Sequence, residues 1–160
     1  MRTFLLPIAD REPLAWILAE QRTAFSPWRA REAEEIGPGD RLLLYTTRGC
    51  FHNPTRDRGR IIGLATVTAS SSKPRKPVRF GDREYTVGVP FAIERLARLR
   101  QGVELSPLVE RLSSFPNPRA WSGRMRRALV PLTSEDADLL VRELEQVARP
   151  YPDELASYAA

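Results

Sequence analysis

The sequence contains a single cysteine, Cys50, and a single histidine, His52. One cysteine excludes an intramolecular disulfide, and the two residues together are too few for a zinc site made of cysteine and histidine ligands, including the zinc centre of nucleobase deaminases. A Cys–His nucleophile pair needs both side chains held together, and both lie in a polar loop, so we assign them no catalytic role. We expect neither a metal nor a cofactor.

Familiar catalytic motifs are also missing. The sequence has no Gly-x-Gly-x-x-Gly and no Gly-x-x-x-x-Gly-Lys loop. The absence of both motifs argues against nucleotide hydrolysis by enzymes that hold phosphates with such glycine-rich loops. It has no Gly-x-Ser-x-Gly elbow, and with one histidine a serine triad is not expected.

No apolar run approaches the roughly 20 residues that a membrane-spanning helix needs. The first seven residues end at a proline and are soon followed by Asp10, which fits a first strand better than a signal peptide. We therefore expect a cytoplasmic protein without a membrane partner. The chain has 160 residues, of which 42% are hydrophobic and 28% charged, a composition that suits one globular domain. We expect this domain to span residues 1–149 and residues 150–160 to form a loose tail.

Lysine is scarce and arginine is abundant. Only Lys73 and Lys76 are lysines among 25 basic residues, and the net charge is +5. GC-rich codon usage is one explanation; the other is anion recognition, for which guanidinium is better suited than ammonium. Residues 46–83 hold nine basic and two acidic groups, whereas residues 134–160 hold two basic and seven acidic groups. This segregation favours a surface patch that faces nucleic acid.

The order of expected elements indicates an α+β fold. Strands are predicted at 2–8, 42–47, 60–69, 78–80, 83–96 and 125–132, and helices from 11 to about 25, at 28–36, at 108–112 and from 133 onward. Residues 78–87 form a hairpin with a two-residue turn, and residues 115–123 form a loop. Strands and helices alternate without a regular strand–helix unit. We therefore predict a small, mixed, partly closed β barrel of five or six strands with short flanking helices, rather than a doubly wound sheet.

The most informative stretch runs from residue 37 to residue 67. A Gly-Pro-Gly-Asp turn precedes an apolar strand that ends on Tyr45, Thr46 and Thr47, and an arginine-rich loop leads to a strand with Gly63 in its interior. Interior strand glycines mark a bulge or a close backbone approach. Aromatic and hydroxyl groups at a strand end, beside a basic loop, suit a planar polar ligand attached to an anion. A nucleotide is such a ligand.

Three aromatic residues each have a structural and a binding interpretation. Trp28 follows Ser26-Pro27 on a charged segment and either packs onto the barrel or forms the wall of an open pocket. Tyr45 is either a core residue with its hydroxyl at the rim or part of that pocket. Trp121 lies between arginines in a polar loop, which is typical of a base-stacking surface but also suits a loop anchor. Trp16 is expected to pack on the first helix.

In their order and spacing these features resemble the EVE domain, a member of the PUA-like superfamily that also includes the YTH and ASCH domains. The resemblance covers roughly residues 3–145 and is carried by the Trp28 segment, the turn 38–40, the strand 42–46, the glycine-bearing strand 63–67 and the late stretch 124–133. It implies a β pseudo-barrel with a pocket at one end. Such a pocket would take a flipped or single-stranded base, plain or modified.

The resemblance implies a base pocket with two walls and a floor. Its residues would be Ser26, Trp28, Tyr45, Thr46, Phe91 and Trp121. Trp28 would form one wall, and Trp121 or Phe91 the second. Ser26 would read the base from beside Trp28, while Tyr45 and Thr46 would line the floor. The arginines expected to hold phosphates are Arg48, Arg56, Arg58, Arg60, Arg119, Arg124, Arg126 and Arg127.

We therefore predict a non-enzymatic domain that binds DNA or RNA and signals through an effector protein. Two alternatives stay open. One is a small-ligand or protein interaction module on the same barrel. The other is an amidohydrolase of the ASCH type, whose chemistry resembles one based on a lysine, a threonine and an acid. Here the only lysines lie in the proline-rich connection 70–77, which argues against a positioned catalytic lysine.

Overall fold

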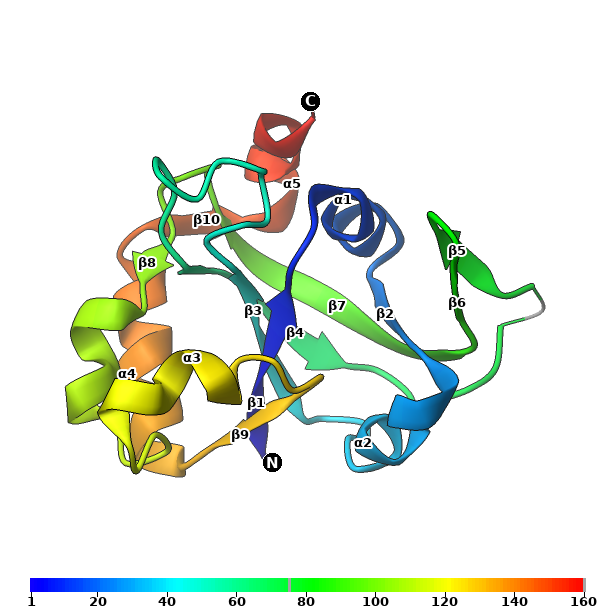
Figure 1. Cartoon of the computed structure of the whole chain (residues 1–160), viewed down its shortest axis with the longest axis horizontal. Helices are drawn as coiled ribbons and strands as arrows, with labels where there is room; N and C mark the ends of the chain where they lie inside the picture. The colour runs from blue at the N-terminus through cyan, green and yellow to red at the C-terminus, as the bar shows by residue number, and fades with distance from the viewer. Residues whose placement is uncertain (75, 160) are drawn as a thin grey trace.

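The computed structural model describes residues 1–74 and 76–159, and its centre is one strongly curled mixed sheet (Figure 1). The main path of the sheet runs β10 (Ala148–Pro150), β7 (Val87–Ala97), β4 (Arg60–Val67), β3 (Arg41–Thr46), β1 (Thr3–Ile8) and β9 (Val130–Leu132). Two further strands pair beside this path: β2 (Arg22–Phe25) with β7 and β8 (Val103–Glu104) with β4. The structure confirms the predicted fold class, an α+β half-barrel with short helices.

The parallel pair β1–β3 lies inside the sheet, between β4 and β9. A parallel pair needs a crossover connection, and here it contains α1 (Arg11–Glu20), β2, a 3₁₀ turn η1 (Pro27–Arg29) and α2 (Ala30–Glu34). As predicted, Asp10 caps α1, because its side chain accepts a hydrogen bond from the Glu12 amide at 3.2 Å. The helix ends at Gln21 in a left-handed conformation.

Alternating residues of β1 and β3 supply two separate cores, one on each face of the sheet. Phe4, Leu6, Leu42 and Leu44 pack with α1 in the first cluster. Their neighbours Leu5 and Leu43 pack in the second cluster with Leu140 and Leu144 of α4 (Ser134–Glu145). Figure 1 shows α1 and α4 on opposite sides of the central strands. The period of two in a strand explains why both faces of this sheet are apolar.

Gly63 lets β4 curl. The register shifts between Leu44 and Tyr45 in β3–β4 and between Leu64 and Ala65 in β4–β7. A Cβ at Gly63 would lie 3.1 Å from the backbone oxygen of Arg95. This is the bulge and close approach that the interior glycine predicted.

The structure differs from the sequence analysis at several elements. The first helix stops at Glu20, and Arg22–Phe25 becomes a strand because its backbone pairs with β7. The expected loop 115–123 contains a 3₁₀ turn, η3 (Pro118–Ala120), followed by the helical turn α3 (Trp121–Arg124). The closing strand is short, since only residues 130–132 pair with β1. The expected hairpin is present as β5 (Val78–Phe80) and β6 (Arg83–Tyr85), and residues 106–111 form the 3₁₀ segment η2 (Ser106–Arg111).

The C-terminal segment, expected to be loose, folds back on the domain. It forms α5 (Tyr151–Glu154) and a 3₁₀ turn, η4 (Leu155–Tyr158), above β10 in Figure 1. The Tyr158 hydroxyl donates to the Ala97 carbonyl at 2.6 Å, and the Tyr151 hydroxyl donates to the Leu18 carbonyl. Two partly buried hydroxyl contacts and the β10–β7 pairing order a segment whose composition alone gives no such signal. In the described part of the chain no helix has the length and hydrophobicity to cross a bilayer.

Candidate nucleic-acid interface

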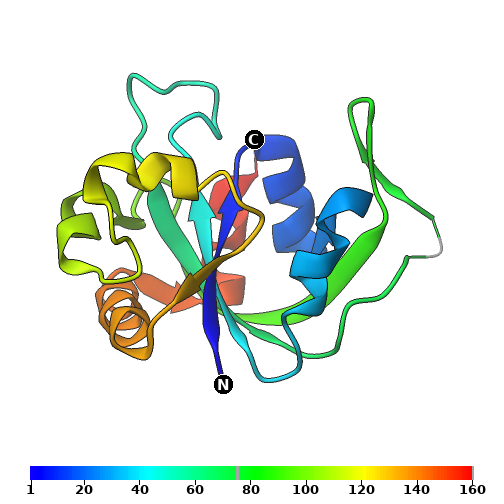
Figure 2. The same cartoon turned by 60° about the horizontal axis from the view of Figure 1, so that its bottom comes forward.

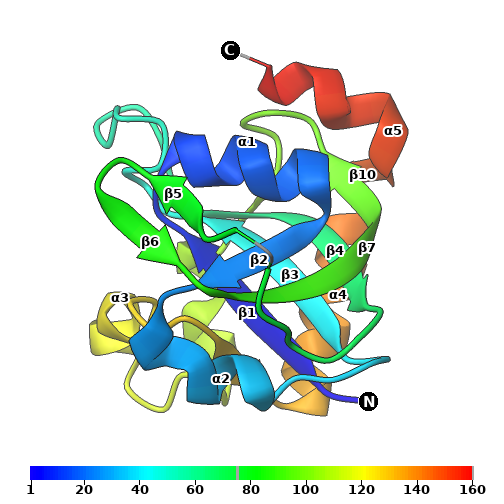
Figure 3. The same ribbon diagram turned by 90° about the vertical axis from the view of Figure 1, so that its right-hand side faces the viewer.

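A wide, open groove of about 1900 Å³ runs across one side of the domain. Its lining comes from the end of β1, the start of α1, β2 and η1, the loop after β3, the β5–β6 hairpin and residues 121–128. In Figure 2 the yellow segment containing α3 lies to the left of α1 and of the η1–α2 segment. Figure 3 shows the hairpin beside α1.

Trp28 is a large aromatic side chain that the fold leaves in solvent. Its exposed fraction is 77%, and it lines the groove. It sits in η1, which Pro27 starts, and the Arg29 amide donates to the Ser26 carbonyl at 3.0 Å. Exposed tryptophans are uncommon because burial of so large an apolar surface is favourable. Trp28 therefore does not pack onto the barrel, which was one of the two interpretations that the sequence left open for this residue.

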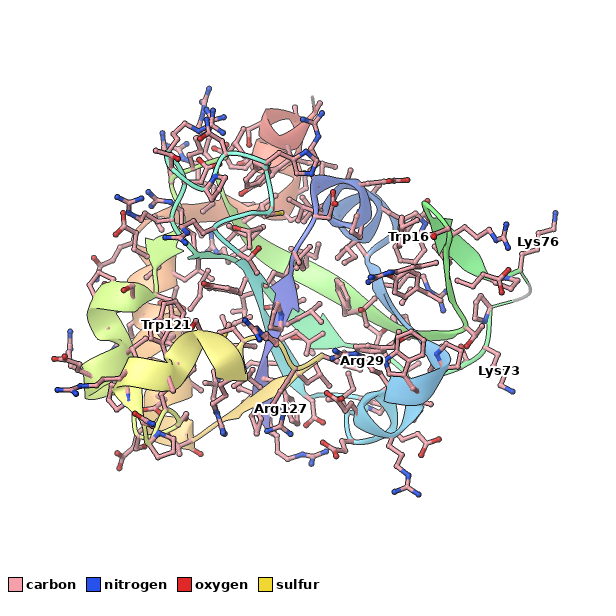
Figure 4. The ribbon with its side chains drawn as sticks, viewed as in Figure 1. Trp16, Arg29, Lys73, Lys76, Trp121 and Arg127 are labelled. Atoms are coloured by element: carbon pink, nitrogen blue, oxygen red, sulfur yellow. The ribbon has the colours of Figure 1, made fainter. Side chains whose placement is uncertain are left out.

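Two contacts tie the Trp28 segment to the opposite side of the groove. The Arg29 Nη2 donates to the Arg126 carbonyl at 3.2 Å, and the Leu129 amide donates to Glu32 Oε2 at 3.3 Å. Arg29 and Glu32 also lie 4.0 Å apart as an ion pair. In the view of Figure 4, Arg29 and Arg127 lie between Trp121 on the left and Trp16 on the right. These contacts place Trp28 relative to the arginines of residues 124–127.

Tyr45 lies at the floor of the groove. It is 3% exposed, and burial raises its pKa to about 12 although the charge of Arg48 opposes this shift. Its ring packs so closely on Gly59 that a Cβ there would lie 1.8 Å from the Tyr45 hydroxyl oxygen. Among the described residues this hydroxyl has no hydrogen-bond partner, so it keeps a donor and an acceptor for a ligand in the groove. Ser26, 5% exposed, is a second buried hydroxyl in the lining.

Four of the six expected base-pocket residues line the groove: Ser26, Trp28, Tyr45 and Trp121. The other two do not. Thr46 is buried with its hydroxyl 3.5 Å from the Arg60 carbonyl, because successive side chains of a strand point to opposite faces. Phe91 is 4% exposed and packs in the first core cluster.

The expected phosphate-binding arginines divide into groups. Arg48, Arg58, Arg126 and Arg127 line the groove. Arg124 and Arg127 line a second, smaller pocket, whereas Arg119 lines neither. Arg56 and Arg60 are held by the protein itself. Arg56 donates to both carboxylate oxygens of Asp57 at 2.8 and 2.9 Å, and Arg60 donates to the Gly102 carbonyl at 2.8 Å and to Glu104 at 3.2 Å.

Asp57 organises the loop after β3. Its side chain is 6% exposed and lies 3.6 Å from Arg100 as well as against Arg56. The hydrogen bonds from Arg56, with the charges of Arg56 and Arg100, hold the pKa of this carboxyl below its usual range, although burial acts in the opposite direction. Arg56 of this loop and Arg100 of the turn after β7 therefore hold the loop in place, and neither lines the groove.

The sequence analysis missed an aromatic cluster on the other side of the groove. The rings of Trp16 and Phe80 meet edge to face with centroids 5.8 Å apart, and Phe80 and Tyr85 lie 5.4 Å apart. All three line the groove together with Arg79 and Arg83 from the same hairpin. The only available signal was the two aromatics on either side of the hairpin turn. A sequence does not show that the hairpin folds against α1.

The residues of classical nucleophilic chemistry do not assemble. Cys50 is fully buried, and burial, with smaller contributions from Asp10 and Asp57, raises the pKa of its thiol to about 12. His52 instead lies at the surface, where its Nε2 is 3.4 Å from Asp10. Lys73 and Lys76 are exposed and lie at the edge of the molecule, far from Trp121 (Figure 4). Within residues 1–74 and 76–159, no cluster of His, Cys, Asp and Glu could hold a metal.

No protein-family model and no curated protein matches the sequence. Among solved structures, the Toxoplasma CPSF4-YTH domain in its apo form has a TM-score of 0.62 at 12% identity, covering 91% of this chain and 87% of that chain. The Mmi1 YTH domain in complex with RNA has a TM-score of 0.61 at 10% identity, covering 92% and 83%. An NMR structure from Rhodopseudomonas palustris has a TM-score of 0.54 at 18% identity, covering 91% and 94%. The chain thus has a fold similar to that of YTH domains, and at these identities the likeness shows the fold alone.

Proposed function

We propose that this domain binds single-stranded DNA or RNA and holds one base in the groove beside Trp28. The observation that carries the proposal is the 77% exposed Trp28 in a groove that is also lined by Arg48, Arg126 and Arg127. A fold similar to that of an RNA-bound YTH domain supports it.

The arginines supply affinity that does not depend on sequence. In the described part of the chain, Arg48, Arg126 and Arg127 form no ion pair, so they are available for phosphates without breaking an internal contact. Phosphate contacts release counterions, so binding weakens as salt rises. They also position the strand without reading its bases.

The aromatic residues supply stacking, and the buried hydroxyls supply discrimination. A base stacked on Trp28 gains about 1–3 kcal/mol. Tyr45 and Ser26 at the floor offer hydroxyls to the edge of that base. The Trp16–Phe80–Tyr85 cluster adds apolar surface to the same groove, and this surface suits the methyl group of a modified base. A base in a duplex must first be unstacked at a cost of a few kcal/mol, which favours single strands.

Binding is proposed to occur without catalysis. Of the groups that activate substrates, the one thiol is buried and the one histidine faces a carboxylate at the surface. Both lysines are exposed and neither lines the groove. The residues that do line it are suited to stacking, hydrogen bonding and charge pairing.

The proposal is tested by fluorescence anisotropy with labelled octanucleotides of DNA and RNA, single-stranded and duplex, with plain, methylated or hydroxymethylated bases, at two salt concentrations. We expect salt-sensitive binding to single strands, with a preference among bases. Salt-sensitive binding without any base preference would reduce the proposal to a general nucleic-acid surface. No binding at low salt would refute it and favour a small-ligand module.

A further inference from the structure

A second pocket of about 270 Å³ adjoins the groove at Trp121. It is lined by Phe115, Pro116, Asn117, Ala120, Trp121, Arg124 and Arg127. Trp121 and Arg127 also line the groove, so the two sites share a wall. The volume of this pocket lies just below the range that is typical of sites for a complete small ligand. It is therefore suited to a fragment of a ligand whose remainder is bound elsewhere.

The lining of this pocket combines apolar side chains with two arginines. Phe115, Pro116, Ala120 and Trp121 form an apolar wall, and Arg124 and Arg127 complete the lining. Arg124 Nε is buried and has no hydrogen-bond partner among the described residues. Buried donors without an acceptor are rare and costly. An anion bound beside Arg124 would supply the acceptor that this donor lacks.

From this arrangement we infer that the second pocket binds the nucleotide next to the one held in the groove. Its base stacks on the pocket side of Trp121, and its phosphate lies between Arg124 and Arg127. The inference rests on the proposed function, since a nucleotide tethered to a bound neighbour reaches the shared wall without a separate association step. The domain then reads two consecutive nucleotides of a single strand, and Trp121 separates them.

The first measurement is ¹⁹F NMR of the protein labelled with 5-fluorotryptophan, whose three signals are assigned with the Trp16→Phe, Trp28→Phe and Trp121→Phe variants. The ligands are a nucleoside 5′-monophosphate and a single-stranded octanucleotide of the same base, chosen from the panel above. We expect both ligands to shift the Trp28 signal. The Trp121 signal should shift further with the octanucleotide than with the monophosphate.

The second measurement is the affinity of Ala120→Asp, which places a carboxylate in the second pocket only. Ala120 is exposed, so the fold should tolerate the change. We expect octanucleotide binding to weaken about five-fold or more, the size of one lost stacking contact, while monophosphate binding is unchanged. The matched control is Ala156→Asp, an exposed alanine of η4 that lines neither site.

The outcomes separate the two proposals. Octanucleotide binding by Ala120→Asp that equals that of Ala156→Asp overturns the second subsite and leaves the groove intact. A Trp28 signal that shifts while Trp121 stays unchanged with the octanucleotide does the same. If the octanucleotide binds neither the wild type nor the variants, the proposed function fails, and the second subsite fails with it.

Discussion

At the scale of single residues, the side chains of the groove divide into those that the fold needs and those that it does not. Trp28 is 77% exposed and contributes little to the core, whereas Tyr45 is 3% exposed and belongs to the second core cluster. Substitutions at these two sites should therefore separate binding from stability.

Trp28→Ala should weaken binding of the preferred single strand by about 1–3 kcal/mol because a stacking surface is lost. Its effect on the free energy of unfolding should be small, since the side chain is exposed. Anisotropy titrations measure the first and urea denaturation the second. Trp28→Phe is the control and should retain most of the affinity. Wild-type affinity in Trp28→Ala would contradict a role for this residue in the groove.

Gly59→Ala should lower the free energy of unfolding by about 1–3 kcal/mol, the usual cost of overpacking. The added Cβ would meet the Tyr45 hydroxyl oxygen at 1.8 Å, and it would push the ring into the core. Gly49→Ala is the matched control, because a Cβ there has nothing within 4 Å. Urea denaturation of both variants provides the comparison. Equal stability would show that Tyr45 moves aside at no cost.

At the scale of elements, the loop after β3 and the β5–β6 hairpin both line the groove. The loop is held by the Asp57 contacts with Arg56 and Arg100, and the hairpin by Phe80 against Trp16. Both sets of contacts depend on side chains outside the main sheet. The loop should respond to pH through its carboxylate.

Asp57 makes part of the stability of the domain depend on pH. Its pKa is lowered in the folded protein, so its contribution is fully present above the unfolded value of 3.8 and is lost as pH falls below it through the folded value. We expect Asp57→Asn to unfold more easily at pH 7 and to lose less stability than the wild type between pH 5 and pH 2, a range of roughly three units around these pKa values. Urea denaturation at several pH values measures this. The exposed Asp153→Asn is the control; if the two variants behave alike, Asp57 does not hold the loop.

At the scale of the whole molecule, charge is sorted between the groove and the C-terminal region. The seven acidic groups of residues 134–160 lie on α4 and the segment after it, whereas Arg48, Arg58, Arg126 and Arg127 line the groove. Such separation steers a polyanion toward one face. It also predicts which arginines contribute to the salt dependence of binding.

Arg127→Gln should weaken binding to all single strands to a similar degree and reduce the slope of log affinity against log salt by about one, the result expected for one lost phosphate contact. Arg142→Gln on α4 removes the same charge outside the groove and is the control. Affinity measured at four or more salt concentrations gives both slopes. Identical slopes in the two variants would place Arg127 outside the phosphate path.

Much of the local structure is predictable because its causes are local. The cap at Asp10, the hairpin around Gly81-Asp82 and the interior glycine of β4 each depend on neighbours in sequence, and the structure contains all three. The strand Arg22–Phe25 was not predictable because its partner β7 begins more than 60 residues later. The aromatic cluster of Trp16 and Phe80 depends on a contact of the same kind.

By itself, the sequence determined the class of fold, the arginine-rich character and the lack of a disulfide, since these depend on composition and on the spacing of apolar residues. Only the tertiary structure decided which aromatic and basic residues share the groove. Arg56 and Arg60 carry the same side chain as Arg48 and Arg127, yet the first two are paired with Asp57 and Glu104 while the others line the groove. The reason is physical: a guanidinium binds the acceptor nearest to it in space, and that neighbour is created by folding.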